Sequence, residues 1–158
     1  MNEITMLIAA ALGTLGFSLI YQVNAKHLPA ATLGGVISCS VYIIFNALGA
    51  GPFGSNFVAM LVAATVSEIF ARIFRAPTAI FLLPCVIPLV PGGGLYYTMS
   101  YLISEKYALA ADYGKSTLLT ALGIAAGMIA ASVIWSMLSN LLLNKIKNKN
   151  STSNSNSN

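Results

Sequence analysis

The sequence predicts an all-α integral membrane protein of about five transmembrane helices, and three observations lead to this fold class. The 158 residues are 57% hydrophobic and only 8% charged, whereas about a quarter of the residues in a soluble domain are charged. The apolar residues form five long runs, most of them close to the roughly 20 residues that a spanning helix needs. The cations lie at the ends of these runs and in the C-terminal tail, which is typical of orientation at a membrane surface. We therefore expect one transmembrane helical domain over residues 1–147.

Each apolar run predicts one helix. The first run lacks the cationic segment that begins a cleavable signal peptide, so we expect it to be retained. Glycines and a proline in residues 49–56 predict a loop between the second and third helices. Ser104–Lys115 is amphipathic and is a candidate interfacial segment, and the Asn/Ser-rich tail 148–158 is expected to be disordered and cytoplasmic. In chain order, the expected helices cover Ile4–Val23, Ala30–Leu48, Phe57–Phe74, Thr78–Ile103 and Ser116–Leu143.

The positive charges predict the orientation of the five spans. Lys106 and Lys115, which alternate with acids, fall on one side of the membrane. Because cytoplasmic loops contain the excess of Lys and Arg, the opposite side is expected to be cytoplasmic. The N-terminus is then outside and the C-terminus inside. The cations on the cytoplasmic side are Lys26, Arg72, Arg75, Lys145, Lys147 and Lys149.

Small residues recur at every fourth position in three of the runs. Such stripes let helix backbones approach closely, which matters because apolar burial alone does not drive association between helices already in lipid. We expect contacts within the chain, with contact to a partner as the alternative. The triplets are Ala30, Gly34 and Ser38; Ala59, Ala63 and Ser67; and Gly123, Gly127 and Ala131.

Prolines and glycines interrupt the fourth run near its middle. Pro84, Pro88 and Pro91 precede Gly92–Gly94. Proline removes a backbone donor and clashes with the carbonyl four residues earlier, so this segment cannot be a regular helix. Backbone groups freed inside a membrane are tolerated only where protein or a water-filled cavity satisfies them. Transporters use such broken helices to bind ions or polar substrates; the alternative is a structural kink without a ligand.

This segment also identifies a family. The string Ile87-Pro88-Leu89-Val90-Pro91-Gly92-Gly93-Gly94-Leu95-Tyr96, with Arg75-Ala76-Pro77-Thr78 upstream, resembles the C-terminal membrane module of the threonine/serine exporter family. The resemblance extends over roughly Ile4 to Leu143, and the length is similar to that of the small subunit in the two-component version of the family. Its specificity lies in the proline-glycine motif, because the other helices match mainly by hydropathy.

The resemblance implies secondary export of small polar metabolites across the bacterial cytoplasmic membrane. Threonine and serine are the substrates of some members, and dicarboxylates such as succinate are those of others. The family also implies a larger membrane subunit as the partner of this multi-pass chain. No catalytic residue is transferred by the resemblance. The candidate substrate-binding or translocation residues of the motif are Pro88, Pro91, Gly92, Gly93, Gly94 and Tyr96.

Glu68 is a further candidate because it lies inside the third run. An acid within a membrane is costly and is often functional. Arg72 is four residues later on the same helical face, so the alternative is a paired carboxylate near the headgroups. Tyr96, Tyr97 and Tyr101 are either hydrogen-bonding groups for a polar substrate or ordinary interface anchors.

The sequence does not favour an enzyme. The only acids are Glu3, Glu68, Glu105 and Asp112, and His27 is the single histidine. This set contains no paired carboxylates, no Ser-His arrangement and no group of metal ligands at helical spacing. No phosphate-binding loop is present either, so we expect no cofactor and no metal, and an ion gradient is the default source of energy. The cations are at the ends of apolar runs, which argues against nucleic acid as a partner. A structural subunit that only supports a substrate-binding partner is the main alternative function.

Overall fold

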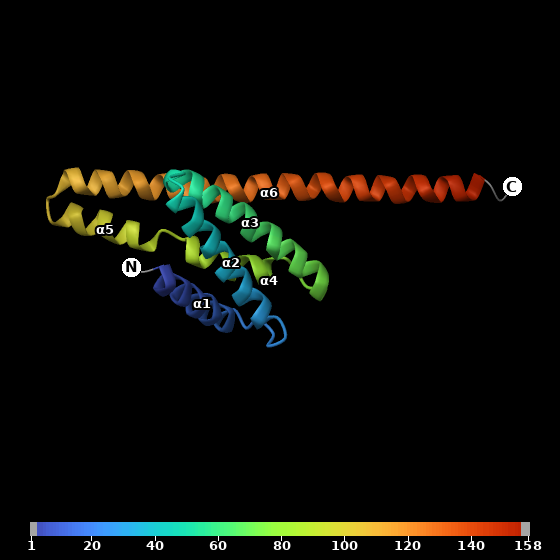
Figure 1. The fold of residues 1–158 in the computed structure, drawn as a ribbon, viewed down its shortest axis with the longest axis horizontal. Helices are drawn as coiled ribbons and strands as arrows, with labels where there is room; N and C mark the ends of the chain where they lie inside the picture. Colours follow the sequence, from blue (N-terminus) through green and yellow to red (C-terminus); the bar gives the residue numbers. More distant parts are fainter. Residues whose placement is uncertain (1–2, 156–158) are drawn as a thin grey trace.

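The structure, a computed structural model, describes residues 3–155, with side chains described as far as residue 138. Its described residues form helices joined by short turns, with no strand among them, which confirms the predicted fold class. Figure 1 shows the arrangement, in which α6 is the longest helix and extends beyond the others. In chain order, the elements are α1 (Glu3–Ile20), α2 (Leu28–Ala47), α3 (Gly51–Phe74), α4 (Ala79–Val86), the 3-10 helix η1 (Ile87–Leu89), α5 (Gly92–Ile103) and α6 (Tyr107–Ser155).

The described helices supply four or five membrane spans. Helices α1, α2, α3 and the Tyr107–Leu138 part of α6 are each long and apolar enough to cross a membrane. Ala79–Leu89 and Gly92–Ile103 meet at an angle of 43° and pass the same test only as a pair. If this bent pair is one span, the total is the five that the sequence predicts.

Two expected boundaries are wrong. Helix α3 begins at Gly51, so most of the predicted loop 49–56 is helical. Pro52 lies in the first turn, where its missing N–H has no intrahelical role and its fixed φ suits the helix. Helix α6 begins at Tyr107 and not at Ser116, so most of the amphipathic stretch is the start of that helix and not a separate interfacial segment.

The predicted disorder of the tail stays a prediction. Residues 156–158 lie outside the described residues, and the side chains of 148–155 lie outside them as well.

The small-residue stripes pack helices against one another within the chain. A Cβ on Gly123 would lie 2.5 Å from the carbonyl oxygen of Phe53, and one on Gly127 would lie 2.6 Å from that of Phe57. Helices α3 and α6 therefore approach each other at backbone distance, as the stripes predict. In α2, a Cβ on Gly34 would collide with the sulfur of Cys85 in α4. Both cysteines are buried and free, which agrees with a packing role.

Helix α5 is placed differently from the rest. It packs against α6 and buries none of its own side chains within the chain. With the first part of α6 it forms a hairpin that projects beyond α1–α4 (Figure 1). Rings from both helices gather in this hairpin: Tyr97 contacts Tyr101 and Tyr113 at centroid distances of 6.2 and 5.4 Å.

Candidate functional site

The fourth run breaks between η1 and α5. Pro84 lies inside α4 and Pro88 inside η1, after which Val90 is extended (φ −62°, ψ 125°) and Pro91 is outside the helical region (ψ 53°). The sequence analysis expected the glycines to be unwound as well. That expectation is wrong, because Gly92–Gly94 form the first turn of α5. The prolines alone are sufficient to end one helix and set the start of the next.

A side chain from α2 stabilises the backbone just before the break. The hydroxyl of Ser38, which is fully buried, lies 2.9 Å from the carbonyl oxygen of Cys85 and 2.9 Å from that of Gly35 in its own helix, so its single proton is shared between these two acceptors. Pro88 has no N–H to offer to this part of α4. Ser38 therefore supplies a donor at the point where the regular ladder ends.

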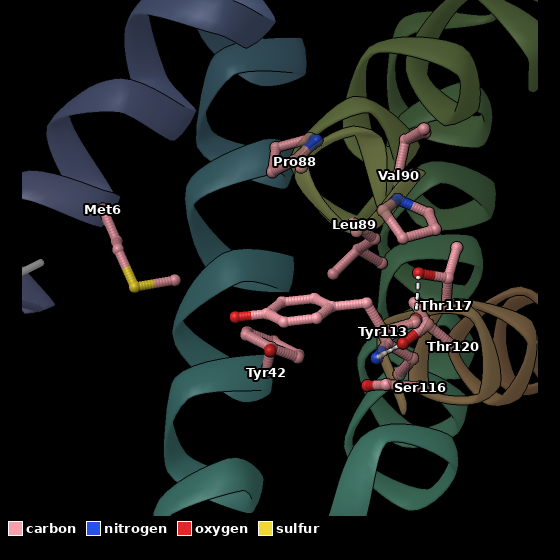
Figure 2. Close-up of a pocket in the computed structure, with 13 residues that line it drawn as sticks. Met6, Tyr42, Pro88, Leu89, Val90, Tyr113, Ser116, Thr117 and Thr120 are labelled. Atoms are coloured by element: carbon pink, nitrogen blue, oxygen red, sulfur yellow. Dashed lines mark hydrogen bonds between the residues drawn. The ribbon is translucent and has the colours of Figure 1, made fainter. Parts of the chain in front are cut away.

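A cavity of about 500 Å³ opens at the break, between α2, α3, the η1–α5 junction and α6. Figure 2 shows Tyr113 extending across it from α6 toward α2. Apart from Met6 of α1 and the residues of the junction, most of its lining groups are polar and uncharged. The lining residues are Met6, Tyr42, Asn56, Pro88, Leu89, Val90, Pro91, Gly93, Gly94, Tyr113, Ser116, Thr117 and Thr120.

Asn56 is the most buried polar group of this cavity, with 2% of its surface exposed. Its amide nitrogen donates to the carbonyl oxygen of Pro52 at 2.7 Å and lies 3.5 Å from the hydroxyl oxygen of Thr120. Among the described residues, no donor is bound to its amide oxygen. The Asn56 side chain is thus held in place by α3 and α6 while its oxygen is available to a ligand.

The amino end of α5 supplies a second set of polar groups. The first turn of any α-helix leaves N–H groups without intrahelical acceptors and carries a partial positive charge. In α5, the N–H of Leu95 bonds to the carbonyl of Pro91 at 3.1 Å, and Gly93 and Gly94 precede it on the cavity wall. Such a helix start favours an anionic group, for example a carboxylate.

A scan against models of known protein families supports the same conclusion as the motif. Residues 6–134 match the model described as Threonine/Serine exporter, ThrE. The chain belongs to this family. No solved structure matches it. The threonine/serine exporter family is a family of transporters and not of enzymes, and with its several apolar helices this member is a multi-pass membrane protein.

Four of the predicted site residues meet at the cavity of this exporter. Pro88, Pro91, Gly93 and Gly94 line it. Three others do not: Gly92 is outside the lining, Tyr96 is 68% exposed and packs against Tyr97, and Glu68 belongs to α3 and lies beside the start of α4, away from the cavity. The structure thus gathers part of the motif at the cavity.

Sequence reasoning missed the polar face of α6. Tyr113, Ser116, Thr117 and Thr120 are three or four residues apart, which places them on one face of a helix. The spacing of these polar residues was not interpreted as a helix face because the fifth helix was expected to begin only at Ser116. Asn56 was missed for a similar reason, since it was assigned to a loop. An asparagine inside an apolar helix indicates a polar site, because a buried amide group needs hydrogen-bond partners.

Glu68 belongs to a separate polar cluster that joins three helices. One carboxylate oxygen accepts a hydrogen bond of 3.2 Å from the hydroxyl of Thr78, and the other is 4.0 Å from the Arg72 guanidinium. Arg72 in turn lies over the ring of Trp135, with its guanidinium carbon 4.1 Å from the ring centroid. The cluster therefore links the end of α3, the start of α4 and the middle of α6.

Proposed function

We propose that the chain is the small membrane subunit of a two-component secondary exporter in the bacterial cytoplasmic membrane. Its substrates are small polar metabolites, and the cavity at the helix break binds them. The observation that supports this most directly is the coincidence of a cavity of about 500 Å³ with the broken segment. Ligand pockets for small molecules have volumes of about 300–1,000 Å³, and transporter sites are typically built at discontinuous helices.

The chemistry of the cavity favours an amino acid such as threonine or serine over a dicarboxylate. None of the described residues that line it is charged. A zwitterion has no net charge, so the start of α5 can receive its carboxylate while Asn56 and hydroxyl oxygens accept hydrogen bonds from its ammonium group. Two carboxylates without a compensating cation cost much more to bury. A dicarboxylate would need cations from the partner subunit.

Helix α5 supports the need for a partner. Its main packing partner among the described residues is α6, and it buries none of its side chains. Because the cavity wall includes the start of α5, a larger subunit that covers this hairpin would also complete the enclosure of the substrate.

Reconstitution tests the proposal against the structural-subunit alternative. The chain, the larger subunit and the two together are placed in liposomes, and efflux of labelled threonine and of labelled succinate is measured. We expect efflux only with both subunits, and inhibition when Gly93 at the cavity wall is replaced by valine. If this substitution leaves efflux by the pair unchanged, the chain has only a supporting role. Efflux by the isolated chain would refute the two-component assignment.

The proposed orientation has its own test. The charge bias places the C-terminus in the cytoplasm and the turn at Gly49 outside. Fusion of a reporter enzyme that is active only in the cytoplasm after Asn158 should give activity. Activity at this position from a reporter enzyme that works only outside the cytoplasmic membrane would refute the proposed orientation.

A further inference from the structure

The Glu68 cluster lies away from the candidate substrate cavity and has no role in the function proposed so far. Glu68 is inside the segment of α3 that is long and apolar enough to span the membrane. An ionisable residue in such a segment is retained at a cost, and its partners indicate what it does. Here the partners are a hydroxyl and a distant guanidinium, and 30% of the Glu68 side chain stays uncovered by the chain. The carboxylate is therefore only partly compensated.

A small cavity gives this carboxylate room for a proton carrier. It has a volume of about 40 Å³, and its lining combines the polar residues Glu68, Thr78, Ser132 and Trp135 with the apolar residues Ala64, Leu82, Met128 and Ala131. A cavity of at least about 10–15 Å³ with polar walls is large enough for one water molecule. The cavity beside Glu68 therefore has room for a water molecule, which can deliver a proton to the carboxylate.

The cluster also contacts the residue at the start of α4. Thr78 is the residue that precedes the first turn of α4, and its hydroxyl is bound to Glu68. Arg72 is held by the Trp135 ring of α6. Helix α4 continues through η1 to Pro88 and Pro91, which line the candidate substrate cavity. A change in the Glu68 charge at one end of this segment therefore acts on the element that forms the cavity wall at the other end.

We propose that Glu68 is a proton-binding residue whose protonation releases the start of α4 and changes access to the cavity at the helix break. The proton adds to one carboxylate oxygen, and the side chain changes from an anion to a neutral acid. The neutral acid attracts Arg72 less and is a weaker acceptor for the Thr78 hydroxyl. The groups that face Glu68 are Arg72 from α3, Thr78 from α4, and Ser132 and Trp135 from α6; of these only Arg72 is charged. For the proposed exporter, Glu68 is then the positioning residue through which a proton gradient acts, and this part rests on the proposed function.

The test measures access to the cavity without any substrate. Cys39 and Cys85 are replaced by alanine in the full chain, and a single cysteine is introduced at Val90, which lines the cavity. The rate at which Val90→Cys reacts with a small water-soluble thiol reagent is measured from about pH 8 to about pH 4, a range in which ordinary carboxylates change charge. The rate is divided by that of Ser104→Cys in the α5–α6 turn, which corrects for the pH dependence of thiol reactivity. We expect the ratio of the Val90→Cys rate to the Ser104→Cys rate to differ about fivefold between the two ends of the pH range. This is the lower end of typical coupling between two sites.

Variants assign the response to Glu68. Glu68→Gln is expected to remove the pH dependence and to hold the ratio at its low-pH value, whereas Glu68→Asp retains a titrating group and should restore the dependence. Glu3→Gln, at the exposed start of α1, is the matched control and should behave like the parent. Thr78→Val, which removes only the hydrogen bond, should reduce the response. This variant keeps the proposal falsifiable if Glu68→Gln does not fold.

Two results would overturn the proposal: a ratio that does not depend on pH in the parent, or a full response in Glu68→Gln or Thr78→Val. A second measurement uses the two-subunit complex in liposomes. There Glu68→Gln should exchange labelled threonine across the membrane at the parental rate, while export driven by a proton gradient should decrease at least about fivefold. If neither complex exports anything, the proposed function fails, but the labelling result still decides whether Glu68 controls the cavity.

Discussion

The two ends of the α4–η1 segment differ in chemistry. At its carboxyl end, the candidate substrate cavity is lined by hydroxyls, an amide and the first turn of α5, and none of its described lining residues is charged. At its amino end, Glu68 and Arg72 form a charged cluster around a cavity of only about 40 Å³. The first cavity is large enough for a metabolite and the second only for water.

The candidate substrate cavity and the charged side chains thus lie at different ends of the α4–η1 segment. A substrate that crosses a membrane must bind and leave, so a fixed full charge in its site would hold an oppositely charged group too tightly. Helix ends and amides bind polar groups more weakly. Glu68, in α3 beside the other end of the α4–η1 segment, does not line the substrate cavity, so under the proposal above it takes up a proton without contacting the substrate.

The largest effect is expected from a side chain that fills the uncharged cavity. Gly93 lines the cavity, and a Cβ on it would meet no atom within 4 Å. Gly93→Val therefore adds bulk where substrate is expected to bind without a clash inside the fold. We expect export by the two-subunit complex to decrease more than about tenfold, which corresponds to about 1.4 kcal/mol of lost binding.

Gly92→Val is the matched control. Gly92 is the preceding residue of the same helical turn, also has open space around it, and does not line the cavity. Both variants have the same cost in helix propensity. Parental export by both variants would show that the cavity is not the site, and an equal loss of export in both would indicate damage to α5 itself.

A smaller effect is expected from removing the buried amide. Asn56→Leu keeps a similar volume but removes the groups that bond to Pro52 and Thr120 and the amide oxygen available to a ligand. One hydrogen bond contributes about 0.5–1.5 kcal/mol, so the apparent affinity for threonine should weaken about fivefold. Asn46→Leu, at the exposed end of α2, is the control. Unchanged affinity in Asn56→Leu would remove this residue from the site.

The sequence predicted more of the fold than of the site. Hydropathy located the spans because each helix in lipid must be apolar over a fixed length. The stripes containing Gly34 and Gly127 predicted close packing correctly, since small residues at a spacing of four have few other uses in a membrane. The prolines located the break. Predicting where the helix resumes was harder, because glycines are compatible with both an unwound segment and a first helical turn.

The cavity required tertiary structure. Its wall combines Asn56, Tyr42 and the face of α6 that includes Thr120, which are separated in the sequence and meet only when α2, α3 and α6 pack. The errors at the starts of α3 and α6 also hid the polar residues there. Tyr96 was predicted as a candidate because it follows the motif directly. In the structure it lies on an exposed part of α5 and does not line the cavity.

The smallest effect is expected in the middle of the α4–η1 segment, where Ser38 of α2 contacts the backbone of α4. Its hydroxyl bonds to the carbonyl of Cys85, and Ser38→Ala removes this donor from a fully buried place. The expected loss is about 1 kcal/mol, which lowers the midpoint of thermal unfolding in detergent by roughly 2–4 °C for a chain of this size. Ser40→Ala is the control, because the Ser40 hydroxyl bonds only to the carbonyl of Val36 in its own helix. Equal midpoints for the two variants would mean that the Ser38 hydrogen bond does not stabilise the break.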